Sequence, residues 1–200
     1  MVVETSITDD PAEVLTECGN GYYIRLATLS DLSMIREIEI VAGSRFIGTG
    51  LLDKFFNDSG DQKITTFDQT RLCALVEKQQ VWVVCHHAEP VGFAICAIFG
   101  KAAFLEEIDV LPAHGRRGLA TKLIEHACRW AANNGLECMD LCTFESVPWN
   151  GPFYKKLGFV ILSPEEWSSE ILAEREMEKV AGLPMETRIV MRLHLVPSEG

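Results

Sequence analysis

A turn rich in glycine and arginine, placed between a strand and a helix, most constrains how this chain can fold. It covers His114 to Thr121 and reads H-G-R-R-G-L-A-T. Before it, the apolar run from Ala102 to Val110 indicates a strand, and after it residues Leu119 to Asn134 have the spacing of an amphipathic helix. The combination predicts a domain in which helices pack on a sheet.

The same turn has the properties of a phosphate-binding site. A turn that opens a helix leaves several backbone N–H groups without partners, and the helix dipole adds positive potential there. Arg116 and Arg117 add full positive charges. The turn lacks the Lys-Ser/Thr pair of a nucleoside-triphosphate loop and the complete G-x-G-x-x-G of a dinucleotide fold. A diphosphate with a long uncharged arm fits better, because the preceding strand can run beside the arm. Coenzyme A is therefore the expected ligand.

The order of the apolar segments predicts one α/β (α+β) domain. Its expected core is a mixed central sheet of about six to seven strands flanked by helices. Residues Met1 to Gly21 are acidic and are expected to form a tail, with residues 22–200 forming the domain. The expected strands are 22–27, 81–85, 91–99, 102–110, 138–143, 158–162 and 188–195, and the expected helices are 32–41, 66–78, 119–134, 152–157 and 164–180.

Composition narrows the possible functions. With 200 residues, 48% of them hydrophobic, the chain can bury a full core. A formal net charge of -11 argues against binding to nucleic acid or to an anionic membrane, and no apolar run approaches the ~18 residues of a membrane span. Seven cysteines without a C-x-x-C pair or a histidine cluster predict reduced thiols, a cytoplasmic protein and no metal site.

Three stretches resemble the GNAT superfamily of acyl-CoA N-acyltransferases. They are L-E-E-I-D-V-L-P at 105–112, G-R-R-G-L-A at 115–120 and V-P-W-N-G-P-F-Y-K-K-L-G-F at 147–159. Gly118 and Ala120 match the family's loop, Gln/Arg-x-x-Gly-x-Gly/Ala, whereas Gly115 stands where the family has Gln or Arg. Arg116 or Arg117 would then make the phosphate contact that Gln or Arg makes in the family.

The resemblance implies an N-acetyltransferase with acetyl-CoA as co-substrate and no metal. The sheet would be splayed beside the strand that ends at Val110, so that the pantetheine arm pairs with this strand and a backbone N–H near Val110 polarises the thioester. The coenzyme-binding residues implied in this way are Ile108, Asp109, Val110, Gly115, Arg116, Arg117, Gly118, Leu119, Ala120, Thr121, Asn150, Phe153 and Tyr154.

Proton transfer is assigned to three candidates. Tyr154 has the family position of the acid that protonates the departing thiolate, unless its ring only packs against the coenzyme. Strand alternation places Glu106 on the face of Ile108 and Val110, and Glu107 on the other face. In the family the face that carries Glu106 often supplies polar groups beside the amine, so the resemblance makes Glu106 the first candidate for the base, acting through water, and Glu107 is the second because a bulge would exchange the faces. The remaining alternative is an amine that loses its proton unaided.

Arg45, Phe46 and Trp149 are the candidates for the acceptor pocket. Arg45 would bind an acceptor carboxylate or be an ordinary surface residue, and the two aromatic rings would line the pocket or pack in the core. The expected acceptor is the primary amine of a small molecule. The alternatives are a protein or peptide N-terminus or lysine, and a non-catalytic acyl-CoA-binding module. A monomer or a homodimer is expected.

Overall fold

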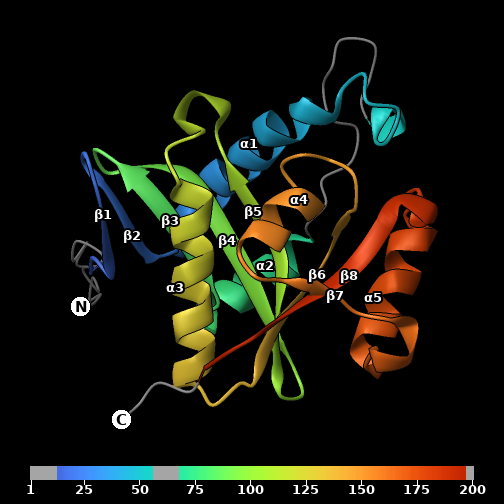
Figure 1. Ribbon diagram of the computed structural model, residues 1–200. Coiled ribbons are helices and arrows are strands. Elements are labelled where there is room, and N and C mark those ends of the chain that lie inside the picture. Colours follow the sequence, from blue (N-terminus) through green and yellow to red (C-terminus); the bar gives the residue numbers. More distant parts are fainter. Residues whose placement is uncertain (1–12, 56–67, 197–200) are drawn as a thin grey trace, which may run out of the picture.

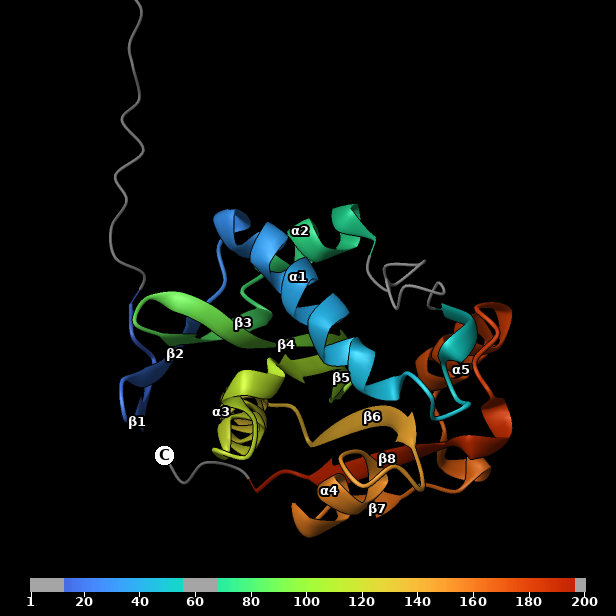
Figure 2. The same ribbon diagram turned by 90° about the horizontal axis from the view of Figure 1, so that it is seen from above.

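The computed structural model describes residues 13–55 and 68–196 and contains one sheet between two layers of helices (Figures 1 and 2). The expected mixed α/β sheet is confirmed, with eight strands in the order β1-β2-β3-β4-β5-β6-β8-β7. The strands are β1 (Thr16–Gly19), β2 (Tyr22–Leu26), β3 (Val81–His86), β4 (Glu89–Phe99), β5 (Ala102–Val110), β6 (Cys138–Phe144), β7 (Val160–Ile161) and β8 (Arg188–His194).

The additional strand is β1, which lies inside the expected N-terminal tail. It pairs antiparallel with β2, and the pairing joins Thr16 to Ile24 and Gly19 to Tyr22. The prediction that the tail extends to Gly21 is therefore wrong. The sequence T-E-C-G is short and polar, so the strand depends on its pairing with β2 rather than on an apolar pattern of its own.

Helices cover both faces of the sheet (Figure 2). One face carries α1 (Leu32–Gly43) and α2 (Gln69–Glu77), and the other carries α3 (Leu119–Asn133) and α4 (Gly151–Lys156). The fifth helix, α5 (Ser169–Val180), lies near the β7 and β8 end of the sheet (Figure 1). No helix among the residues described is long and apolar enough to cross a membrane.

Two helices begin later than the sequence predicts, because capping side chains set their first turns. The Asp68 side chain accepts a hydrogen bond from Arg71 N at the start of α2, and residues 66–67 of the expected helix lie outside the described residues. Ser168 caps α5 by accepting from Ile171 N. The expected start of this helix at Pro164 is wrong, since Pro164–Glu166 form a separate turn of 3-10 helix.

The apolar stripe of α3 explains its place on the sheet. Leu123, Ile124, Ala127 and Ala131 are buried at helical spacing, and they join one core with residues of β4, β5 and β6. The opposite face of the sheet packs a second core against α1 and α2. The phosphate-binding turn therefore lies at the N-terminus of a helix that is firmly packed along its length.

The sheet opens between β5 and β6. These two strands pair in parallel from Ala102 to Leu105 and from Cys138 to Leu141, and they then separate (Figure 1). On its other side β6 remains paired along its whole length, from Cys138–His194 to Phe144–Arg188. Among the residues that the structure describes, the second half of β5 therefore has no strand beside it on the β6 side, which is the splay expected at the coenzyme slot.

A buried ion pair ties β6 to β8 at the point where β6 leaves β5. Asp140 and Arg192 are cross-strand partners, and the guanidinium donates two hydrogen bonds of 2.7 Å to the carboxylate. Asp140 is only 2% exposed. Removing one member of a buried pair leaves the other charge without compensation.

We expect Asp140→Asn to lower the free energy of unfolding by about 3 kcal/mol, because Arg192 loses its buried carboxylate. Glu137→Gln is the control, since its ion pair with Lys101 is exposed (63% and 80%) and should contribute less than about 1 kcal/mol. Urea unfolding followed by circular dichroism measures both. Similar small losses in the two variants would show that the Asp140 pair does not hold β6.

Candidate active site

A β-bulge in β5 decides which side chains face the splay. Ile95 pairs with Glu107 and Cys96 pairs with Leu105, so Glu106 is an extra residue without a partner on β4. As a result, Leu105 shares a face with Ile108 and Val110, and all three contact the core that contains α3. The expected alternation, with Glu106 on the face of Ile108, is therefore wrong, because a bulge shifts the alternation by one residue.

The carboxylate of Glu106 is already paired. Arg71 of α2 holds it through two guanidinium nitrogens, with the Nε contact at 3.3 Å, and the Glu106 side chain is only 7% exposed. The same guanidinium also reaches Glu174 of α5, at 3.4 Å. Glu106 thus connects β5 to the helices around it, and its charge is compensated before any substrate binds.

Glu107 and Asp109 lie on the face away from the α3 core, and both have strongly raised pKa values. Burial is the main cause for Glu107, whose pKa rises to about 8, and the charge of Glu39 adds to the effect. The pKa of Asp109 is well above its usual range because of burial and then of Glu107. Arg188 opposes the shift at Glu107 and Arg45 opposes it at Asp109. Glu107 therefore titrates near neutral pH, and the pKa of Asp109 is shifted in the same direction.

The third carboxylate of this group, Glu39, was not a candidate in the sequence. It lies on α1 and is 4% exposed, on the buried face with Ile35, Ile38 and Ala42. The sequence spacing could have identified it. Glu39 follows Ile35 by four positions and precedes Ala42 by three, which places it within the apolar stripe of the helix. A charged residue inside such a stripe indicates a functional or paired carboxylate.

Tyr154 reaches the same region from α4. It is 7% exposed, and its ring contacts Phe159 with centroids 5.5 Å apart. Burial raises its pKa, and the charges of Glu107 and Asp109 raise it further. The phenol therefore keeps its proton in the resting site and interacts electrostatically with carboxyl groups on the other side of the splay.

The phosphate-binding turn has the expected geometry at the N-terminus of α3. Gly118 adopts a left-handed conformation (φ 76°), and a side chain there would extend into open space. The first helical hydrogen bond runs from Lys122 N to Gly118 O (3.0 Å), so the N–H groups of 119–121 precede it and remain available. Gly115 N instead donates to Pro112 O at 3.1 Å. Together with the exposed Arg116 and Arg117, the turn can hold a pyrophosphate.

The free edge of β5 can bind an extended arm. Leu111 N donates to Val91 O at 2.9 Å, and alternate residues of an antiparallel ladder face the same neighbour. Asp109 therefore faces β4, whereas the backbone groups of Ile108 and Val110 face the gap. The Val110 N–H, at the end of β5, can therefore polarise a carbonyl group in the slot.

Asn150 lies on the other side of the gap. Its Nδ2 donates to Thr143 Oγ1 at 2.8 Å, and its buried Oδ1 has no hydrogen-bond partner among the described residues. A buried carbonyl oxygen of this kind can accept an N–H group from an amide-containing arm. Phe153 packs partly buried against the α3 core nearby.

The structure brings the three acceptor candidates together. The Arg45 guanidinium lies 4.5 Å from the centre of the Trp149 ring, and Phe46 contacts that ring edge-to-face at 5.7 Å. Phe46 also contacts Phe144, at the end of β6, with centroids 5.4 Å apart. These contacts join the end of α1 to the loop between β6 and α4, so aromatic rings meet where β6 has left β5.

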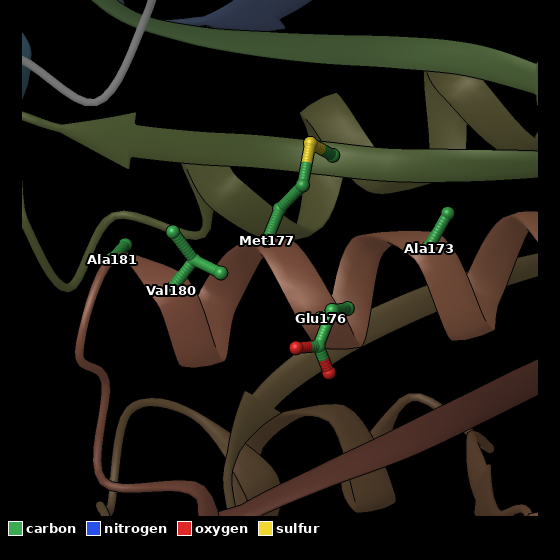
Figure 3. Close-up of a pocket in the computed structure, with 5 residues that line it drawn as sticks. All are labelled: Ala173, Glu176, Met177, Val180 and Ala181. Carbon is green, nitrogen blue, oxygen red and sulfur yellow. The ribbon is translucent and has the colours of Figure 1, made fainter.

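A hollow of ≈560 Å³ on α5 contains none of these groups (Figure 3). It is lined by Ala173, Glu176, Met177, Val180 and Ala181. Its lining is apolar apart from one carboxylate, so it offers neither an acid–base pair nor a phosphate-binding turn. Within residues 13–55 and 68–196, no group of three or more His, Cys, Asp or Glu side chains could hold a metal ion.

Solved structures of three acetyltransferases share this fold. N-acetylglutamate synthase from Neisseria gonorrhoeae, with coenzyme A and N-acetyl-glutamate, has a TM-score of 0.65 and 15% identity over 88% of this chain and 35% of its own. PaiA N-acetyltransferase from Thermoplasma acidophilum, with coenzyme A, has a TM-score of 0.63 and 14% identity over 86% and 98%. The ribosomal-protein-S18-alanine N-acetyltransferase from Escherichia coli has a TM-score of 0.58 and 17% identity over 90% and 97%.

These likenesses establish the fold, and this chain spans about a third of the first protein and nearly the whole of the other two. The model of the acetyltransferase (GNAT) family matches residues 47–159, more than half of the chain. The match includes β5, the phosphate-binding turn, α3 and the helix of Tyr154. The chain therefore belongs to the GNAT family of acetyltransferases, enzymes that use acetyl-CoA as the acetyl donor.

Proposed function

We propose that this enzyme acetylates the primary amine of a small molecule by direct attack of the amine on the thioester. The observation that supports this most is the buried phenol of Tyr154, whose pKa is raised by burial and then by the charges of Glu107 and Asp109. Bound acetyl-CoA supplies an acetyl thioester. Val110 N–H polarises its carbonyl, Glu107 accepts the proton that the amine loses, and Tyr154 gives its own proton to the departing thiolate.

Glu107 is a better base than Glu106 for a physical reason. A general base works best when its pKa lies near the operating pH, and burial raises the pKa of Glu107 to about 8. Glu106 is engaged by the guanidinium of Arg71, which occupies its carboxylate oxygens. The bulge that separates these two neighbours thus assigns a structural contact to one and proton transfer to the other.

A small acceptor fits the end of the slot better than a peptide does. The contacts among Arg45, Phe46 and Trp149 bridge α1 and the loop that precedes α4, so an extended chain would have to displace them. Arg45 is exposed and can pair with an acceptor carboxylate. Seven unpaired cysteines support a reducing, cytoplasmic setting.

A panel of primary amines, amino acids and short peptides, incubated with acetyl-CoA and followed by mass spectrometry, tests this proposal. We expect an acetylated small amine and acceptor-dependent release of coenzyme A. Acetylation confined to peptide N-termini or lysines would assign the enzyme to the protein-modifying class. Binding of acetyl-CoA without any acceptor-dependent turnover would indicate a binding module.

Gly118→Asp should weaken acetyl-CoA binding at least tenfold, roughly 1.4 kcal/mol, because it places a negative charge where a pyrophosphate approaches the backbone. Isothermal titration calorimetry measures the affinity. Gly100→Asp is a matched control, since Gly100 also has a positive φ (57°) and open space but lies in the turn between β4 and β5. Equal affinities in both folded variants would remove the turn from the coenzyme site.

Tyr154→Phe keeps the ring and deletes only the hydroxyl. We expect kcat to fall about 10- to 100-fold with acetyl-CoA affinity nearly unchanged, because only the proton donor is lost. Tyr23→Phe, on β2, provides a control for loss of another phenol whose pKa is raised by burial. If kcat of Tyr154→Phe equals that of the native enzyme, solvent protonates the thiolate and Tyr154 only packs.

The pH profile distinguishes the two glutamates. Since the Glu107 pKa is raised to about 8, its basic form increases as pH rises through that value, and kcat/KM should rise with it. Glu107→Gln should lower kcat/KM about 100-fold and abolish this rise, leaving only the titration of the substrate amine. Glu106→Gln should retain the rise. If the rise disappears in Glu106→Gln and persists in Glu107→Gln, Glu106 is the base. If it persists in both variants, water accepts the proton of the amine.

A further inference from the structure

Three histidines gather beside the phosphate-binding turn without any role in the chemistry described above. His86 ends β3, His87 follows it in the turn to β4, and His114 lies directly before Gly115. The His86 ring is 4.1 Å from that of His87 and 5.5 Å from that of His114. Tyr22 stacks on His86 at 4.3 Å and shares a hydrogen bond of 2.8 Å with His114 Nδ1.

The histidine cluster (His86, His87 and His114, with Tyr22) has charged neighbours on the loop and on β4. Burial lowers the pKa of His86, and His87 in its own turn, His114 from the segment before the loop and Arg117 from the loop lower it further. The neighbouring strands contribute Tyr22, which stacks on His86, and Glu89, which pairs with His86 across the hairpin. Imidazoles gathered around a guanidinium attract an anion.

The backbone of the turn supports a role beyond folding. His87 and Ala88 both have positive φ values, 49° and 71°, in a two-residue hairpin turn. Turns of this type favour Asn and Gly, because other side chains are strained there. A histidine in that conformation contributes an imidazole at a site where the fold itself would be served better by another residue.

The cluster and the phosphate-binding turn share residues. Arg117 belongs to the turn, and its guanidinium lies 6.0 Å from the centre of the Tyr22 ring. In coenzyme A, the pyrophosphate and the 3′-phosphate are attached to the same ribose, so a pyrophosphate on the turn keeps the phosphomonoester one sugar away. We propose that His86, His87 and His114, with Arg117, form a phosphomonoester subsite that binds the 3′-phosphate of the coenzyme.

Binding at this subsite is coupled to protons. A phosphomonoester dianion favours the protonated form of each imidazole that it contacts, so binding takes up protons. The His86 pKa lies below its ordinary value in the absence of an anion. The contribution of the 3′-phosphate to affinity should therefore be larger at pH 6 than at pH 8, because acid favours the imidazolium form.

The comparison of coenzyme A with 3′-dephospho-coenzyme A tests the subsite by titration calorimetry. In the native enzyme we expect an affinity ratio of about tenfold at pH 6 and a smaller ratio at pH 8. The double variant His86→Gln/His87→Asn, in which Asn suits the positive φ, should bring the ratio at pH 6 close to one and leave the affinity for the dephospho form unchanged. His194→Gln, an exposed histidine at the end of β8, is the control.

Three results would overturn the proposal. One is an affinity ratio that the double variant leaves intact at both pH values. Another is a ratio lost instead in Lys155→Gln/Lys156→Gln, which would place the 3′-phosphate beside α4. The third is a shift of the histidine NMR signals on addition of inorganic phosphate, together with an affinity ratio that the double histidine variant does not change. This result would assign the cluster to a phosphate group other than the 3′-phosphate.

The inference rests on the phosphate-binding turn of the proposed function, and the two can fail separately. Gly118→Asp should weaken coenzyme A and its dephospho form equally, because both contain the pyrophosphate. The histidine variants should affect only coenzyme A. Unchanged binding of both ligands in Gly118→Asp would reject the turn, whereas an unchanged ratio in the histidine variants would reject only the subsite.

Discussion

The separation of β5 from β6 is the constraint on which the rest of the structure depends. Parallel pairing ends at Leu105 and Leu141, so the backbone groups beyond Leu105 on one edge of β5 require a partner from elsewhere. An extended, amide-containing ligand arm is such a partner. Beyond Leu141, β6 no longer pairs with β5, so its backbone hydrogen bonds in this part are made with β8. The ion pair of Asp140 on β6 with Arg192 on β8 stabilises this pairing. The slot is therefore an interruption of the sheet that the remaining pairing keeps open.

One extra residue in β5 sets the chemistry of that slot. Without the bulge at Glu106, strict alternation from Leu105 would direct Glu107 into the apolar core beneath α3. With the bulge, Ile108 and Val110 fill that core, Glu106 pairs with Arg71, and Glu107 and Asp109 lie together on the other face. Burial is the main reason why their pKa values rise, and the charges of neighbouring carboxyl groups add to it. A change of register thus produces a base suited to neutral pH.

The sequence predicts the elements of this site better than their relations. The strand, turn and helix around Gly118 could be predicted because apolar spacing and helix-end chemistry are local properties. The strand β1 could not, since its stability comes from pairing with β2 rather than from its own residues. The bulge is likewise decided by pairing with β4, and this reversed the expected faces of Glu106 and Glu107. Glu39 could have been found, because its position in the apolar stripe of α1 is visible in the spacing.

A base with a raised pKa carries a cost in stability. A carboxyl group whose pKa is higher in the folded than in the unfolded chain destabilises the fold when it must ionise, so the penalty at Glu107 grows as pH rises from its ordinary pKa of 4.5 to about 8 and is constant above that. The ion pairs around the slot offset this cost. Arg71 joins β5 to α2 and α5 through Glu106 and Glu174, and Arg175 bonds Glu178 on α5 at 2.5 Å, which in turn pairs with Arg188 on β8. Ion-paired charges thus surround the carboxyl groups whose pKa values are raised, and they tie β5, α2, α5 and β8 together around the slot.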